Sequence, residues 1–281
     1  MVKKILAKTY IYFILLLMYL PILILIAFSF SVETTISEGY TFGWDLWANL
    51  FDPSQKISQE IWTALGNTLI VAISSAIVAT ILGTLGAIGA FYSRKRAQKA
   101  IEISTQIPVS NPEIVMALSL VVMFVFIGIK FNFWTLLIGH VVLGLPFVYL
   151  SVKPKLIQMD PNLYEAALDL GCSPRRALTK VVVPQIMPGV LSGFLLSVTL
   201  SLDDFIVTAF TRGPGLLSGN KTIETLSTLI QAKLKKGAIP PEMRPLTLII
   251  FLVVLAIAIT LTIVRNKDAN KVKERKGRAN A

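Results

Sequence analysis

The stretch DPNLYEAALDLGCSPRRALTKVVVP, residues 160–184, is a polar hairpin set between two long apolar blocks. Its residues predict two short helices. Asp160 can cap the first and Gly171 can end it, while Ser173 and Pro174 can begin the second. One apolar stripe follows the helical spacing i, i+3, i+4 and i+7 along the first helix, formed by Leu163, Ala166, Ala167 and Leu170. Such a hairpin can pack on its own protein, lie on lipid or dock into a partner, and the pattern alone leaves the three open.

The apolar blocks on either side of this hairpin, and those further along the chain, are long enough to cross a membrane. Of the 281 residues, 54% are hydrophobic and 15% are charged, against about 25% charged in soluble domains. One helical crossing needs about 20 apolar residues. We therefore predict an all-α, multi-pass membrane protein. Its six expected spans are about 9–30, 64–90, 101–128, 132–152, 184–210 and 246–264.

The basic residues predict the orientation of these spans. Of the 27 Lys and Arg residues, 19 lie on the side that holds both termini and the loop 153–183. Because basic residues favour the cytoplasmic side, we predict that the termini and this loop are cytoplasmic. Residues 1–265 would form the membrane domain, and residues 266–281 a basic, disordered tail. Three lysines in the last outer loop run against the bias: Lys233, Lys235 and Lys236.

Three carboxylates fall within the predicted spans. Glu113 lies in the third span, and Asp203 and Asp204 lie in the fifth, and neither span contains a Lys or Arg. An ionised group in hydrocarbon costs several kcal/mol and usually marks an ion or substrate route, so this placement favours a cationic substrate. Aromatic faces also attract cations. The first outer loop supplies such groups where a substrate would enter, at Trp44, Asp45 and Trp47.

Each of these carboxylates also has a purely structural interpretation. The run Asn111-Pro112-Glu113 is typical of a helix start, where the helix dipole favours an acidic side chain. The two aspartates could instead form hydrogen bonds inside the bundle, for example to Thr199 or Ser201. Adjacent residues on a helix point about 100° apart, so the two aspartates need not share a role.

Several chemistries have no support in the sequence. Cys172 is the one cysteine, so an internal disulfide is excluded. The net charge of +11 gathers beside the apolar blocks, which argues against nucleic-acid binding. The run GLLSGNKT, residues 215–222, has the wrong spacing for a phosphate-binding Walker A loop. No metal-site spacing occurs, and we expect His140 to be a satisfied polar residue inside the bundle.

The hairpin resembles the EAA signature of ABC importer permeases. In that signature EAA is followed by three residues, Gly, nine residues and Ile-x-Leu-Pro. The chain keeps the signature at Glu165, Ala166, Ala167, Gly171 and Pro184, with Val in place of the Ile and the Leu. The resemblance implies a type I importer permease fold, in which the hairpin forms a coupling helix that sits in a cleft of a cytoplasmic ATPase. Glu165 and Gly171 would carry that contact.

Four further runs are similar to permeases of spermidine/putrescine importers, and within them to the second of the two permease subunits. They are LPFVYL (145–150), NPEIVMALSL (111–120), GFLLSVTLSLDDFIVTAF (193–210) and FTRGPG (210–215). This resemblance implies that the substrate pathway uses Glu113, Asp203 or Asp204, and Trp47. A Glu stands at position 113 where the resemblance leads us to expect an Asp.

Together the resemblances imply a transport subunit of the inner or plasma membrane that moves polyamines by alternating access. Its expected partners are a second permease, two cytoplasmic ATPase subunits that hold Mg-ATP, and an external binding protein. The chain itself would be no enzyme and would bind no cofactor. A permease for iron, thiamine or a similar solute remains an alternative, as does, outside active transport, a six-span channel.

Overall fold

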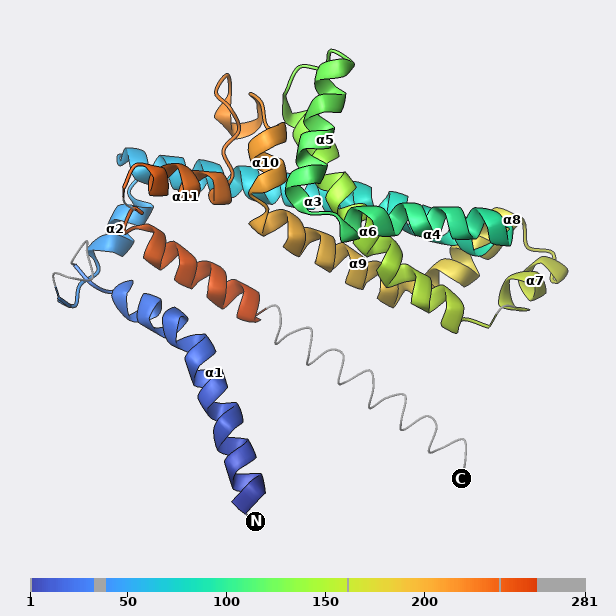
Figure 1. Cartoon of the computed structure of the whole chain (residues 1–281), viewed down its shortest axis with the longest axis horizontal. Helices are drawn as coiled ribbons and strands as arrows, with labels where there is room; N and C mark the ends of the chain where they lie inside the picture. Colours follow the sequence, from blue (N-terminus) through green and yellow to red (C-terminus); the bar gives the residue numbers. More distant parts are fainter. Residues whose placement is uncertain (1, 33–38, 161, 238, 257–281) are drawn as a thin grey trace. The chain divides into compact units, whose positions relative to one another are not determined.

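The computed structural model describes residues 2–32, 39–160, 162–237 and 239–256, with side chains from residue 8 onward. Nearly all regular structure in this part of the chain is helical (Figure 1). The chain divides into two compact units, Met1–Glu60 with Gly237–Ala281, and Ile61–Lys236, and each is described by itself. The predicted tail, 266–281, lies outside the described residues.

The first unit contains α1 (Val2–Phe28), α2 (Asp45–Phe51), the start of α3 (Lys56–Phe91) and a helix over Met243–Ala256. Leu46 and Leu50 lie one turn apart on α2, and both are buried. The Ser58 hydroxyl donates to the Leu50 carbonyl oxygen at 2.6 Å, so the end of α2 is fixed to the first turn of α3.

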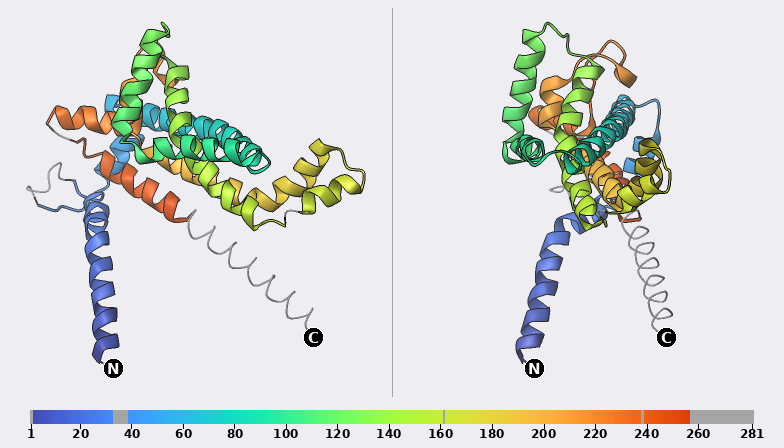
Figure 2. Two further views of the ribbon diagram at one scale, coloured as in Figure 1. Left: turned by 45° about the vertical axis from the view of Figure 1, so that its right-hand side comes forward. Right: turned by 90° about the vertical axis from the view of Figure 1, so that its right-hand side faces the viewer.

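The second unit is built around α6, which is the most enclosed of the candidate spans in the described chain. Helix α4 lies alongside α6, and α5 packs against α10 (Figure 2). Its remaining helices, after α3, are α4 (Lys95–Ser110), α5 (Glu113–Phe126), α6 (Phe133–Gln158), α7 (Asn162–Asp169), α8 (Pro174–Ala177), α9 (Val183–Asp203), α10 (Ile206–Thr211) and α11 (Leu226–Lys235).

Small residues allow α6 and α9 to approach closely. A Cβ placed on Gly193 of α9 would lie 2.9 Å from the Cα of Val148 on α6. One placed on Gly189 would lie 2.8 Å from the carbonyl oxygen of Ser151. Lipid tails are as apolar as the helix side chains, so the hydrophobic effect does not drive helices together in a membrane. Close packing at small residues does so instead. The α6–α9 pair is therefore the scaffold on which the rest of the unit is placed.

The structure supports most of the predicted spans by length and composition. Four described helices are long and apolar enough to cross a membrane, or five if α4 and α5 form one bent span. These correspond to the first five predicted spans. The sixth, 246–264, overlaps the described helix Met243–Ala256 and otherwise lies outside the described residues. The count of six and the orientation of the termini stay predictions.

The third predicted span, 101–128, is not one straight helix. It consists of α4 and α5, whose axes differ by 109° at a short break. Pro112 causes this break, because it has no N–H to donate and it disfavours helical geometry in the preceding Asn111. Glu113 therefore stands at the first position of a new helix.

Candidate functional site

A second helix break lies at the two adjacent aspartates. Helix α9 ends at Asp203, and Asp204 leaves the helical conformation with φ −59° and ψ 126°. The Asp204 carboxylate accepts hydrogen bonds from the backbone N–H groups of Val207 (3.1 Å) and Thr208 (2.8 Å). An acidic side chain in this position satisfies the free amides of a helix start and complements its dipole. Asp204 thus caps α10 from inside the protein, where only 6% of its surface is exposed.

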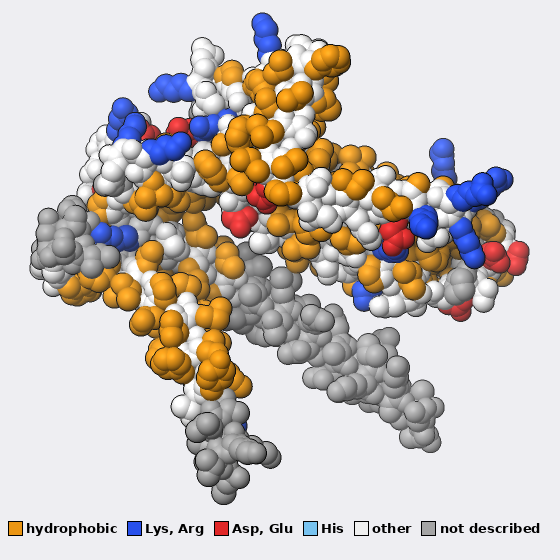
Figure 3. All heavy atoms as spheres, in the orientation of Figure 1, with side chains coloured by type: hydrophobic (Ala, Val, Ile, Leu, Met, Phe, Trp, Pro, Cys, Tyr) orange, Lys and Arg blue, Asp and Glu red, His pale blue; other side chains and the backbone are white. Residues whose placement is uncertain are grey.

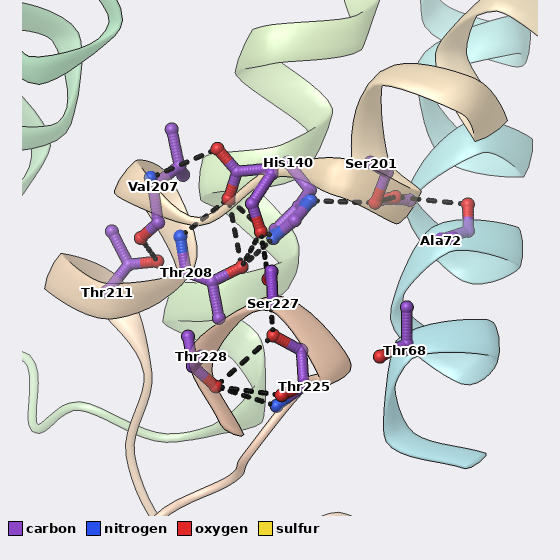
Figure 4. Close-up of polar contacts among 12 residues, drawn as sticks. Thr68, Ala72, His140, Ser201, Val207, Thr208, Thr211, Thr225, Ser227 and Thr228 are labelled. Carbon is purple, nitrogen blue, oxygen red and sulfur yellow. Dashed lines mark hydrogen bonds and ion pairs between the residues drawn. The ribbon is translucent and has the colours of Figure 1, made fainter. Parts of the chain in front are cut away.

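His140 of α6 connects this break to two other helices. Its Nε2 lies 2.9 Å from Thr208 Oγ1 and 3.6 Å from Asp204 Oδ2, and its Nδ1 lies 2.7 Å from Ser201 Oγ (Figure 4). Ser201 Oγ in turn lies 3.3 Å from Ser75 Oγ on α3. The prediction that His140 is a satisfied polar residue within the bundle is confirmed.

The hydroxyl groups determine which atom donates and which accepts in each hydrogen bond of this network. Thr208 donates its one hydroxyl hydrogen to Asp204 Oδ2 at 2.9 Å. It must therefore accept from His140 Nε2–H, which leaves Nδ1 of a neutral ring to accept from Ser201. From the opposite side the Ser227 hydroxyl donates to the Asp204 carbonyl oxygen at 2.6 Å, which brings in α11. Helices α3, α6, α9, α10 and α11 are thus joined by one connected network of hydrogen bonds.

Asp203 and Glu113 are placed differently from Asp204. Both side chains are exposed. Within the described chain neither Asp203 nor Glu113 forms an ion pair. Two exposed carboxylates therefore stand at two helix breaks of the same unit, α4–α5 and α9–α10, and this arrangement can receive ammonium groups.

The structural alternatives for these carboxylates have mixed outcomes. Glu113 does occupy a helix start, as its alternative interpretation requires. Asp204 does accept a hydrogen bond inside the bundle, but from the Thr208 hydroxyl at 2.9 Å and not from the examples Thr199 and Ser201. The Thr199 hydroxyl donates to the Leu195 carbonyl oxygen at 2.9 Å, and Ser201 bonds to His140.

The residues of the predicted first outer loop belong to the first unit, and its tryptophans join an aromatic cluster there. The ring of Trp47 stacks on Phe30 with centroids 5.5 Å apart, and Trp44 meets Phe30 edge-on at 5.1 Å. Trp44 and Asp45, at the start of α2, are exposed. The indole N–H of Trp47 is buried and, among the described residues, has no hydrogen-bond acceptor.

The hairpin after α6 folds as its residues predict. Asp160 Oδ1 accepts from the amide of Asn162 at 2.9 Å, which caps α7. At the other end Gly171 has φ +85°, its amide donates to Leu168, and the amide of Cys172 donates to Ala167. This is the Schellman pattern of a helix end. Added Cβ atoms would meet open space at Gly171, so the backbone angle, and not crowding, requires the glycine.

The apolar stripe on this helix is divided between its two sides: Leu163 and Ala167 are on the side that packs on the protein, and Ala166 and Leu170 are exposed. Leu163 and Tyr164 face the bundle, and the ring centroid of Tyr164 lies 5.0 Å from that of Tyr92 at the end of α3. Leu170 is 86% exposed. The buried side is therefore set by contacts with the bundle. An exposed face remains, which we call the α7 face, formed by Glu165, Ala166, Asp169 and Leu170.

A widened turn joins this hairpin to α9. Residues Leu178–Val182 form a π-helical turn directly before Pro184, which is exposed in the first turn of α9. Pro184 has no N–H to donate to the carbonyl oxygen four residues earlier, so the local helix cannot keep its regular bonding. The signature proline thus marks the entrance to the scaffold helix.

Comparison with known proteins agrees with this architecture. Residues 79–269 match the family model described as "Binding-protein-dependent transport system inner membrane component". The chain belongs to this family. It is accordingly a multi-pass component of the inner membrane and a transport subunit, and its relatives are named as permeases and not as enzymes. Membership implies partner permease and ATPase subunits.

Several named permeases are similar to this one over most of their length. It is 34% identical over 251 residues to the spermidine/putrescine transport system permease protein PotC of Haemophilus influenzae, which covers 89% of this chain and 93% of the relative. The identity to PotC of Escherichia coli K12 is 34%, with 86% and 87% covered. For the putrescine permease protein PotI of the same strain it is 28%, with 83% and 81% covered.

Solved transporters show the same fold at low sequence identity. A bacterial ABC transporter involved in import of the polysaccharide alginate matches this permease with TM-score 0.70 and 15% identity, covering 94% and 96% of the two chains. The MetNI methionine ABC transporter matches with TM-score 0.52 and 18% identity, covering 73% and 91%. The predicted all-α ABC permease fold is confirmed.

Some residues of the Asp204 network of this permease were not found from its sequence. Thr208, Ser227 and Ser75 are single hydroxyl groups in apolar helices, and such groups usually bond to their own backbone. His140 and Asp204 were each recognisable as polar groups in apolar segments. Their pairing was not, since 64 residues separate them and no spacing rule connects α6 to the end of α9.

Proposed function

We propose that this permease is the membrane subunit of a polyamine importer that moves spermidine and putrescine into the cell by alternating access. The observation that carries the proposal is the pair of exposed carboxylates, Glu113 and Asp203, at two helix breaks of one unit. The similarity to permeases named for spermidine and putrescine supports it. A cationic cargo is the class that such carboxylates favour.

In this mechanism Glu113 and Asp203 replace the water that surrounds each ammonium group of the cargo. Charge-assisted hydrogen bonds of this kind are stronger than neutral ones, and they act best where water is excluded. Asp204 has another task, because its oxygens are occupied by α10. It keeps the helix break open, so that Asp203 stays at the protein surface. The cargo must also leave, so we expect weak binding at each carboxylate.

The first outer loop would receive the cargo before it reaches these carboxylates. Trp44 is 60% exposed and borders the aromatic cluster with Trp47. An ammonium group over the face of an indole ring gains about 0.5–2 kcal/mol. The exposed carboxylate of Asp45 adds a charge of the required sign.

The proposed assembly contains a second permease, an external binding protein and two ATPase subunits that hold Mg-ATP. The α7 face supports the ATPase contact, since it places the apolar Leu170 and Ala166 beside Glu165 and exposes all three. A helix that lies against its own bundle on one side and presents such a face on the other can transmit the closing of a partner to α9.

A transport assay on the assembled importer tests this function. The complex would be reconstituted in vesicles with its ATPase subunits and ATP on the inside. Uptake of labelled spermidine and putrescine into the vesicles would then be measured. We expect each polyamine to compete with the other, whereas thiamine and ferric iron do not. Uptake of labelled thiamine or iron, with no polyamine uptake, would assign the alternative cargo.

A further inference from the structure

An apolar groove lies on the second unit between α3, α4 and α6. Its volume is about 400 Å³, which is within the range of about 300–1,000 Å³ typical of sites for small ligands. Residues of α4 from Ala100 to Pro108 form one wall, over about 12 Å of helix. The other walls include Gly83, Gly86, Leu145 and Tyr149.

Two glycines of α3 contribute to this groove in different ways. A Cβ on Gly83 would lie 2.8 Å from Cβ of Val148, so Gly83 is needed for packing against α6. A Cβ on Gly86 would meet no atom within 4 Å. The absence of a side chain at Gly86 therefore leaves the groove open without serving contact between the helices.

The start of α4 carries a dense positive charge at one end of this groove. Arg94, Lys95, Arg96 and Lys99 are exposed, and within the described residues none of them forms an ion pair. The first turn of α4 contains no acidic residue, although the helix dipole favours one there. Glu102, the next carboxylate along α4, is already paired with Lys153. Figure 3 shows basic side chains gathered over this end of the unit.

Two of the four charges, Arg94 and Arg96, lie towards the groove side of α4. Arg94 precedes the groove residue Ile101 by seven positions, so the two share a face of the helix. Arg96 precedes the groove residue Ala100 by four positions, so the two share a face of the helix and lie one turn apart. A ligand in the groove that extends towards the start of α4 therefore reaches both arginines.

We propose that this groove binds an anionic phospholipid, with an acyl chain between α3, α4 and α6 and the phosphate at Arg94 and Arg96. The apolar walls suit a hydrocarbon chain. Basic pockets between membrane helices suit a phosphate on the predicted cytoplasmic side. An apolar helix of another protein would also fill the groove, but it would leave the cations without a counter-charge.

Lipid binding to the purified importer complex tests this site. Dioleoyl phosphatidylglycerol and dioleoyl phosphatidylcholine would be titrated into the complex in detergent, with bound lipid counted by native mass spectrometry. Three variants would be compared with the natural chain: the double change Arg94→Gln with Arg96→Gln, the groove-filling Gly86→Leu, and the control Gly89→Leu. A side chain at Gly89, like one at Gly86, would meet open space, but Gly89 does not line the groove.

We expect a preference for phosphatidylglycerol and a loss of affinity of at least about tenfold in the double variant, because each basic residue near a membrane surface contributes about 1 kcal/mol. Gly86→Leu should remove the same binding event, and Gly89→Leu should keep it. A second charge control, Arg175→Gln with Arg176→Gln on α8, should also keep it.

The proposal is overturned if phosphatidylcholine binds equally well, or if both charge variants weaken binding to the same extent. It is also overturned if Gly86→Leu leaves lipid binding unchanged while it prevents co-purification of the second permease, since the groove would then hold a protein helix. Should Gly86→Leu fail to assemble, Gly86→Val is a smaller change that still narrows the groove, and normal lipid affinity in that variant would likewise refute an occupied groove.

Discussion

The two adjacent aspartates should separate stability from transport. Asp204→Asn replaces a buried oxygen acceptor with an amide group that has donors of its own. The carboxylate accepts two backbone amides and one hydroxyl, so at least one of these donors would face another donor or lose its partner. A buried polar group left unsatisfied costs about 1–3 kcal/mol. Asp203→Asn is an equal chemical change at an exposed side chain, and should alter stability by less than about 0.5 kcal/mol.

The measurement is the thermal unfolding midpoint of the permease within the purified complex in detergent. For a chain of this size 1 kcal/mol corresponds to about 2–4 °C, so Asp204→Asn should lower the midpoint by several degrees and Asp203→Asn should leave it in place. Asp203→Asn should instead reduce uptake. If Asp203→Asn lowers the midpoint as much as Asp204→Asn does, the division of roles between the two residues is refuted.

Three further predictions concern the network and the hairpin. His140→Phe should lower the unfolding midpoint, because Thr208 and Ser201 each lose a hydrogen-bond partner inside the bundle. An unchanged midpoint would contradict a stabilising role of these two hydrogen bonds. Gly171→Ala should cost about 1–2 kcal/mol at φ +85° and impair coupled ATPase activity, whereas Gly89→Ala, with equally open space, should not; equal activity in the two variants would contradict the role of the backbone angle. Leu170→Ser should leave folding intact and weaken ATPase association by about tenfold, as loss of a buried leucine contact implies, while Leu234→Ser on α11 serves as the control; unaltered association would remove the α7 face from the ATPase contact.

Local features of the hairpin were predictable from the sequence because they depend on neighbouring residues alone. Asp160 caps α7 through an amide two residues away, and Gly171 ends it through its own backbone angle. Which side of α7 is buried was not predictable, because Leu163 and Ala167 belong both to the apolar stripe and to the side that packs on the bundle. The contact of Tyr164 with Tyr92 decides between them, and it joins residues far apart in the chain.

The membrane part shows the same division. Apolar length indicated the spans, and the run Asn111-Pro112 marked the point where the third is broken, but no sequence rule gives an angle of 109°. Asp204 was recognisable as a charge within an apolar segment. Its cap on α10 joins residues within four positions, but its contact with His140 forms only after α6 has packed against α9.

The central claim is that exposed carboxylates at the helix breaks receive a cationic cargo. The most direct measurement is the initial rate of spermidine uptake by the reconstituted importer that carries Glu113→Gln with Asp203→Asn. The control is Asp52→Asn, which removes a carboxylate from the predicted first outer loop. This carboxylate is charged at neutral pH, because hydrogen bonds from the Ser54 hydroxyl and amide hold the pKa of Asp52 below its usual value.

We predict that the double variant assembles and unfolds at the normal temperature, and that its spermidine uptake falls by at least about tenfold, because each lost charge-assisted hydrogen bond is worth about 1.5–3 kcal/mol. Asp52→Asn should transport normally. Undiminished uptake in the double variant would contradict the account and leave both carboxylates as features of helix geometry.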